Sequence, residues 1–96
     1  MITIYVLRSF KNGVHYVGMT ENIQRRLIEH NAGKSKFTSG HTPWEIIYTE
    51  MAENFIEGRI REKYLKTSAG KKFYLKVIEM KFKSISLEES NGSLPA

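Results

Sequence analysis

The first residues of the chain alternate between short apolar runs and turn-forming residues. Residues 2–7 are almost continuously apolar, which is the pattern of a strand buried on both faces. Lys11-Asn12-Gly13 follows, and an Asn-Gly pair between apolar runs is a strong hairpin signal. Residues 14–18 then become strand-like again. The pattern therefore predicts a β-hairpin over residues 2–18.

After the hairpin, the apolar positions change to helical spacing. Thr20-Glu21-Asn22 offers capping side chains for a helix that runs to about Ala32, because short polar side chains accept hydrogen bonds from the first turn. Gly33 behind that helix is a typical stop signal. Residues 33–43 are mainly polar and end in proline, so they are predicted to form a loop.

A third strand and a second helix follow the loop. Residues 44–51 are rich in aromatic and β-branched side chains, which favours a strand. Residues 53–66 are predicted to be a helix, because Ile56, Ile60 and Tyr64 recur every four positions and would form one apolar stripe.

The C-terminal part contains a break, a short element and a tail. Ser68-Ala69-Gly70 is interpreted as the break, and residues 72–81 as a third helix, with a strand as the alternative. The predicted domain covers residues 1–82, and the Ser-rich residues 83–96 are expected to be a flexible tail. The order ββαβαα predicts an α+β fold, in which helices flank a three-stranded, mostly antiparallel sheet.

Composition adds a charge that favours a polyanionic partner. The 96 residues suffice for one domain. Residues 1–82 hold 14 of the 15 Lys and Arg and 8 of the 10 acids, for a net charge of +6. Lys and Arg on such a domain release counterions from nucleic-acid phosphates, although many basic proteins bind no polyanion. The absence of cysteine excludes disulfides and thiolate sites.

The chain offers no segment for a membrane. No apolar run approaches the roughly 20 residues that a spanning helix needs, and the N-terminal residues lack a basic leader and a cleavage site. A cytoplasmic location is therefore expected.

Four polar side chains fall where the predicted elements could bring them together. Tyr5 and Tyr16 lie on the two strands of the hairpin and can meet on one region of the sheet. Arg26 and His30 are four positions apart on the first helix, so they are neighbours on one face. The plain alternatives are two ordinary strand tyrosines and a surface arginine beside a hydrogen-bonded histidine.

Glu62 is the candidate carboxylate on the second helix. Its neighbours at helical spacing are partly apolar, and Gly58, one turn earlier, is predicted to leave open space where a ligand could approach. The alternative is a surface ion pair with Arg59 or Lys66, which would contribute little to stability.

Together these segments resemble the GIY-YIG nuclease superfamily, particularly its small stand-alone bacterial and archaeal members. The resemblance runs from about residue 2 to 78. Three departures are visible: Thr3 replaces the first glycine of GIY, Val17 replaces the isoleucine of YIG, and no asparagine after the acidic helix matches, since Asn91 lies in the predicted tail. The matching segments are Thr3-Ile4-Tyr5, Tyr16-Val17-Gly18, Arg26-Leu27-Ile28-Glu29-His30-Asn31, Thr42-Pro43-Trp44-Glu45 and Arg61-Glu62-Lys63-Tyr64-Leu65-Lys66.

The resemblance implies a role for each matching residue. Glu62 would be the sole protein ligand of one Mg²⁺ or Mn²⁺ ion. Tyr5 would assist deprotonation of the attacking water, helped by a neighbouring base for which His30 is a candidate. Tyr16 would orient the water or the phosphate, and Arg26 would offset charge in the transition state. Gly18 would allow a tight backbone turn beside the site.

The implied function is a metal-dependent endonuclease that hydrolyses DNA phosphodiester bonds with low sequence specificity. Branched, damaged or single-stranded DNA in repair or recombination would be candidate substrates, and nothing in the residues excludes RNA. A protein partner could supply specificity, and the sequence indicates no oligomeric state. Phosphate contacts are expected from the basic residues Arg25, Lys34, Lys36, Lys63, Lys66, Lys71 and Lys72.

Two other functions stay open. The first is a non-catalytic nucleic-acid-binding module on the same scaffold. The second is a protein-interaction domain that docks a partner, or a second copy, through the apolar residues 73–82.

Overall fold

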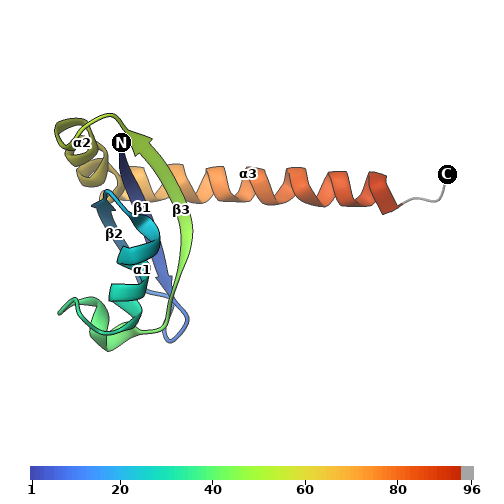
Figure 1. Cartoon of the computed structure of the whole chain (residues 1–96). Helices are drawn as coiled ribbons and strands as arrows, with labels where there is room; N and C mark the ends of the chain where they lie inside the picture. The colour runs from blue at the N-terminus through green and yellow to red at the C-terminus, as the bar shows by residue number, and fades with distance from the viewer. Residues whose placement is uncertain (94–96) are drawn as a thin grey trace.

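A computed structural model describes the backbone of residues 1–93 and the side chains of residues 1–84. The three strands form one sheet, and the long last helix extends away from it (Figure 1). The elements are β1 (Ile2–Ser9), β2 (His15–Thr20), α1 (Ile23–Asn31), the 3₁₀ turn η1 (Thr38–His41), β3 (Trp44–Ala52), α2 (Phe55–Leu65) and α3 (Ser68–Ser93).

The sheet has the order β2-β1-β3, and β1 pairs antiparallel with both neighbours. The predicted α+β fold with a ββαβαα order is therefore confirmed. The central position of β1 explains its composition, because all six residues from Ile2 to Leu7 are buried and need side chains that pack on both faces.

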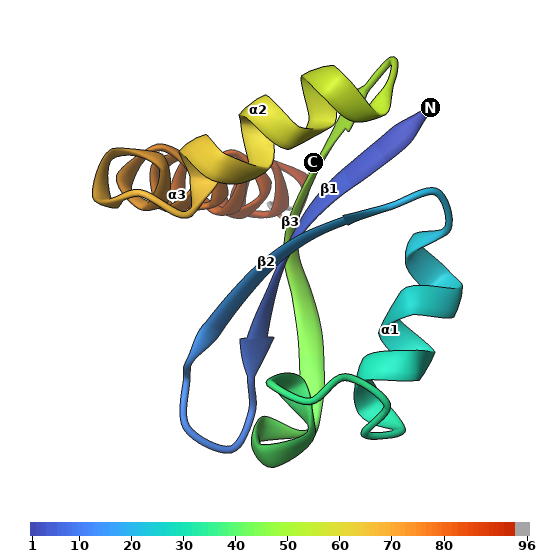
Figure 2. The same ribbon diagram turned by 90° about the vertical axis from the view of Figure 1, so that its left-hand side faces the viewer.

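Different helices cover the two faces of the sheet (Figure 2). On one face, Tyr5, Leu7 and Trp44 form a buried cluster against residues of α1. On the other, Ile4, Val6 and Val17 pack with Leu65 of α2 and Tyr74 of α3. We call these the α1 face and the α2–α3 face.

The predicted start of α1 is confirmed by its cap, and α2 begins two residues later than predicted. The Asn22 side chain accepts a hydrogen bond from the backbone N–H of Arg25 at 3.0 Å. Asn54 does the same for Glu57 at 2.9 Å at the start of α2. Each cap satisfies a backbone donor that the helix itself cannot pair. The predicted loop over 33–43 is confirmed apart from the short turn η1.

The orientation of α2 differs from the prediction. Ile56 and Ile60 are 77% and 63% exposed, so the predicted apolar stripe faces solvent. The helix instead packs on the sheet through Gly58, where a Cβ atom would lie 3.2 Å from Ile2 Cγ2 and 3.4 Å from Met19 Sδ. The prediction of open space beside Gly58 is wrong, because the missing side chain lets the helix approach the sheet.

The helix α3 is longer than predicted and begins earlier. The triplet Ser68-Ala69-Gly70 forms its first turn, and the chain breaks at Lys66 and Thr67 instead. Gly70 is needed there because a Cβ atom would overlap the backbone oxygen of Tyr64. Gly70, interpreted from the sequence as part of a helix break, therefore allows α2 and α3 to cross at close distance.

The helix also continues past residue 82, where a flexible tail was expected, as far as Ser93. Residues 94–96 of that tail lie outside the described residues. The domain boundary at residue 82 stays a prediction. Within residues 1–93, no helix is long and apolar enough to cross a bilayer.

Candidate active site

Tyr5 and Tyr16 lie together on the α1 face. The register of β1 and β2 places Tyr5 opposite Gly18 and Leu7 opposite Tyr16, so both phenols project to the same side of the sheet. Their ring centroids are 6.3 Å apart. The hairpin thus brings the two tyrosines into one site.

Gly18 makes room for Tyr5. It lies inside β2 and not at a turn, so the reason for a glycine differs from the prediction. A Cβ atom here would lie 2.5 Å from Tyr5 Oη and 3.0 Å from the Tyr16 ring, closer than real side chains come. Any other residue would displace the Tyr5 phenol.

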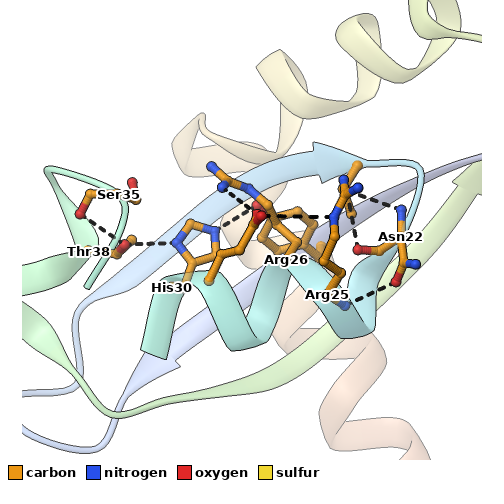
Figure 3. A network of polar contacts seen from close by, with 9 residues as sticks. Asn22, Arg25, Arg26, His30, Ser35 and Thr38 are labelled. Atoms are coloured by element: carbon orange, nitrogen blue, oxygen red, sulfur yellow. Dashed lines mark hydrogen bonds and ion pairs between the residues drawn. The ribbon is translucent and has the colours of Figure 1, made fainter. Parts of the chain in front are cut away.

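A chain of buried hydrogen bonds runs from Tyr5 through His30 to Thr38. Tyr5 Oη is 2.9 Å from His30 Nε2, and His30 Nδ1 is 2.8 Å from Thr38 Oγ1. His30 and Thr38 point toward one another in Figure 3, and all three residues are buried. We call Tyr5, His30 and Thr38 the buried polar chain.

The partners of Thr38 favour one direction for these hydrogen bonds. The Thr38 hydroxyl can donate to the backbone carbonyl of Ser35, 3.4 Å away, which leaves its oxygen free to accept from His30 Nδ1–H. His30 Nε2 is then the acceptor for the Tyr5 hydroxyl, because a neutral imidazole has one donor and one acceptor. The geometry therefore aims the Tyr5 proton at His30.

The protonation states agree with this direction. Burial, and then the charge of Arg26, lowers the pKa of His30 to about 4, so the imidazole is neutral at pH 7. Burial, and then Tyr16, raises the pKa of Tyr5 to about 12, while Arg26 lowers it and Glu62 raises it. The difference between these two pKa values opposes transfer of a proton from Tyr5 to His30 in the protein alone.

Arg26 stands beside this chain on α1. Its side chain is partly exposed and its Nη1 donates to Glu29 Oε1 at 3.1 Å. Figure 3 shows Arg26 and His30 along the same helix. Arg26 is thus a positive charge close enough to Tyr5 to lower the pKa of that phenol, while Arg25 pairs more loosely with Glu29 at 3.9 Å.

Glu62 approaches from α2. Its side chain is 12% exposed, and the predicted alternative partners are both present, with Arg59 Nε at 3.8 Å and Lys66 Nζ at 3.7 Å. Its charge is also close enough to Tyr5 to raise the pKa of that phenol. The carboxylate therefore lies on the tyrosine side of α2.

The donor set around Glu62 fits one hard divalent cation. The described residues contain no group of three or more His, Cys, Asp or Glu that could enclose a metal. Mg²⁺ does not need such a cage, because it usually keeps several waters and takes one or two carboxylates plus substrate phosphates. Glu62 could therefore hold an ion whose other ligands are water and phosphate oxygen.

An aromatic wall continues from Tyr16 and was not predicted. Phe37 stacks on Tyr16 with centroids 5.8 Å apart and planes at 29°. Below it, Trp44 Nε1 donates to the Thr38 carbonyl at 2.9 Å, and Asn31 Oδ1 accepts from the Trp44 backbone N–H at 2.7 Å. The sequence feature that could have predicted this wall is a single aromatic residue, Phe37, in an otherwise polar loop.

An open groove of about 570 Å³ links this wall to the junction of α2 and α3. Of the basic residues predicted to bind phosphate, Lys66 and Lys71 line this groove together with Tyr16 and Phe37. Lys63 lies elsewhere, in an apolar hollow on α2. The others, which the structure leaves exposed and does not bring to the groove, are Arg25, Lys34, Lys36 and Lys72.

The α2–α3 face has its own tyrosine–histidine pair. His15 Nδ1 is 2.7 Å from Tyr74 Oη, in a part-buried position. Burial lowers the pKa of His15, and Lys71 and Arg8 lower it further. Burial also raises the pKa of Tyr74.

Known proteins match both the sequence and the fold. The family model of the GIY-YIG catalytic domain matches residues 1–76. A UPF0213 protein of Halobacterium salinarum is 39% identical over 64 residues, which cover 66% of this chain and 82% of the relative. A UPF0213 protein of Bacillus pumilus is 34% identical over 91 residues, covering 94% and 92%. The solution NMR structure of a UPF0213 protein from Bacillus halodurans has a TM-score of 0.50 at 27% identity, covering 80% of this chain and 85% of that chain.

Proposed function

The chain belongs to the GIY-YIG family, and on that premise we propose that it is a metal-dependent endonuclease that hydrolyses DNA phosphodiester bonds. The observation that carries the proposal is the buried polar chain from Tyr5 to Thr38. A protein core is satisfied more simply by apolar side chains, so a buried, fully paired chain with strongly shifted pKa values supports a chemical role. Tyr16, Arg26 and Glu62 lie around its Tyr5 end.

In this proposal each residue has a separate role in the hydrolysis of one phosphodiester bond. Tyr5 would pass its proton to His30 and then take a proton from the attacking water. Arg26 would favour the Tyr5 phenolate and would offset negative charge on the phosphoryl oxygens in the transition state. Tyr16 would donate a hydrogen bond from its hydroxyl to the water or to the phosphate.

Glu62 would hold the divalent ion, Mg²⁺ or Mn²⁺. Such an ion supplies positive charge for the scissile phosphate and the leaving oxygen. The distances from Glu62 to Arg59 and Lys66, 3.8 and 3.7 Å, exceed those of direct hydrogen bonds. The carboxylate can therefore exchange these partners for a metal at small cost.

DNA is the proposed partner because one residue of the proposed site, Tyr16, shares a groove with lysines. Lys66 and Lys71 line the groove that leads to Tyr16, and the whole chain has a net charge of +5. Such contacts hold the phosphate backbone and carry little sequence information. We therefore propose that cleavage has low sequence specificity. Candidate substrates are the structured DNAs of repair or recombination, with RNA as the alternative. A protein partner would be the source of any further specificity.

One observation favours a second function. The ion pairs of Glu62 with Arg59 and Lys66 neutralise the carboxylate without a metal. A non-catalytic nucleic-acid-binding module would keep such ion pairs as part of its surface. The two functions differ in what happens when Glu62 is changed.

The test compares wild type, Glu62→Gln and a matched variant, Glu79→Gln. Glu79 is ion-paired with Lys83 four positions later, as Glu62 is with Lys66, but it lies on the projecting helix. Plasmid, single-stranded, flap, junction and RNA substrates would be incubated with Mg²⁺ and then Mn²⁺. We expect wild type and Glu79→Gln to cut and Glu62→Gln to bind without cutting. Salt-sensitive binding with no cleavage by any of the three would instead support the binding module.

A further inference from the structure

An exposed aromatic side chain lies directly against the proposed active site. Phe37 is 53% exposed, and one side of its ring stacks on Tyr16. The ring of His41 lies at 5.2 Å from its centroid. Exposing this much of a phenylalanine forfeits the gain from burying it, so the exposed half of the side chain is available for a ligand with a flat apolar face.

The position of Phe37 is fixed relative to the buried polar chain. The next residue, Thr38, begins η1 and is hydrogen-bonded to His30. The carbonyl of Thr38 also accepts from Trp44 Nε1. The backbone that carries Phe37 is therefore tied to His30 and to the core, and the ring stacks on Tyr16.

The groove beside Phe37 has a basic far side. Tyr16 and Phe37 line one part of it, and Lys66 and Lys71 line another. Its volume of about 570 Å³ is comparable to that of small-ligand sites, roughly 300–1,000 Å³. An aromatic surface next to lysines is the combination with which proteins bind single-stranded nucleic acid, because bases stack on the rings and phosphates meet the cations.

We propose that Phe37 is a stacking platform for one unpaired nucleobase beside the scissile phosphate. Inside a duplex, both faces of every base are covered by neighbouring bases, so only an unpaired or terminal base can reach the ring. The substrate class is therefore a strand with an unpaired nucleotide at the cleavage position. This inference deepens the proposed nuclease function and rests on it.

The test measures stacking without cleavage. The full chain would be titrated in EDTA with a single-stranded DNA oligonucleotide that contains 2-aminopurine, and with the fully paired duplex of the same sequence. Fluorescence anisotropy reports affinity, and quenching of 2-aminopurine reports stacking. Phe37→Ala removes the platform, Phe37→Trp preserves it, and Phe55→Ala is the matched control, because Phe55 is 52% exposed on α2.

We expect Phe37→Ala to lose the quenching and to bind the single strand about tenfold more weakly, the order of one base–aromatic contact. Phe37→Trp should retain both signals, and Phe55→Ala should resemble wild type. Duplex binding should be the same for all four proteins. The inference is overturned if wild type shows no quenching, or if Phe37→Ala weakens single-strand and duplex binding equally.

These outcomes are separate from those of the nuclease test. If the protein shows stacking that depends on Phe37 but never cleaves a substrate, the proposed nuclease function is overturned and the stacking platform stands. If the protein shows cleavage that depends on Glu62 but no stacking on Phe37, the stacking platform is overturned and the proposed nuclease function stands.

Discussion

Each face of the sheet carries one tyrosine hydrogen-bonded to one histidine, and the two pairs differ in their access to water. Tyr5 and His30 on the α1 face are both buried, at 2.9 Å. Tyr74 and His15 on the α2–α3 face are joined at 2.7 Å, with His15 half-exposed. Burial lowers both histidine pKa values, but only that of His30 moves as far as about 4.

The surroundings of the two pairs differ although their hydrogen bonds are alike. The two hydrogen bonds have the same chemical groups and nearly the same length. Only His30 has its second nitrogen held by a buried hydroxyl, that of Thr38, and only Tyr5 has Arg26 and Glu62 close enough to change its pKa. Chemistry is therefore expected from the α1 pair alone, and each experiment below tests that difference.

The largest difference is expected in cleavage. Tyr5→Phe removes the hydroxyl that would contact the attacking water in the proposed mechanism, so the rate should fall roughly 10³-fold, within the usual range for acid–base groups. Tyr74→Phe removes a similar hydrogen bond on the other face and should change the rate far less. Single-turnover cleavage of one DNA substrate by both variants is the measurement. Equal losses would show that the two pairs are equivalent.

Acid should destabilise the fold through His30. Folding lowers the pKa of this group from 6.5 to about 4, so between these values the unfolded chain binds the extra proton. Stability is therefore constant above about pH 6.5 and falls as the pH drops toward 4, by about 2 kcal/mol at pH 5. Urea unfolding at pH 7 and pH 5 measures this loss.

The matched variants for the pH experiment are His30→Gln and His15→Gln. Neither glutamine titrates in this range. His30→Gln should lose most of the difference between pH 7 and pH 5, while His15→Gln should keep most of it, since water already reaches His15. An unchanged pH dependence in His30→Gln would contradict the assignment.

A smaller effect is expected at Thr38. Thr38→Val keeps the shape but leaves His30 Nδ1–H without its acceptor in a buried place, which should cost about 1–2 kcal/mol of unfolding free energy. Thr38→Ser restores the hydroxyl and should recover most of the loss. Urea unfolding compares the three proteins, and a Ser variant as unstable as the Val variant would assign the loss to packing and not to the hydrogen bond.

The smallest effect is expected on the outer surface of α2. Ile60 is exposed despite its place in the apolar stripe, so Ile60→Ser should change the unfolding free energy by less than about 0.5 kcal/mol. Leu65 on the same helix is buried, and Leu65→Ala is the positive control for a core residue. A large loss in Ile60→Ser, measured by thermal unfolding, would restore the orientation that the sequence pattern indicated.

Local sequence patterns predicted most of the fold. The Asn-Gly turn, the cap at the start of α1 and the apolar run of β1 act on neighbouring residues, so their effects can be predicted from short segments. The orientation of α2 could not be read in this way. Periodicity shows which residues share a side of a helix, but here the contact with the sheet is made by Gly58, which has no side chain.

The candidate site was predicted in part for a similar reason. Residue types in order identified Tyr5, Tyr16, Arg26, His30 and Glu62 as candidates. The structure adds contacts between distant segments, such as Phe37 on Tyr16, which no local pattern contains. Gly70 was misread because its neighbour, Tyr64, belongs to the preceding helix.

The division of the site between the two faces also orders events during synthesis. Both tyrosines, Arg26 and His30 lie in the first third of the chain, whereas Glu62 comes from α2, which packs against β1 and β2 only after β3 has been made. A ribosome-bound chain would therefore carry most of the site before it carries the proposed metal ligand. The proposed site would therefore stay incomplete until α2 has been synthesised and has packed on the sheet.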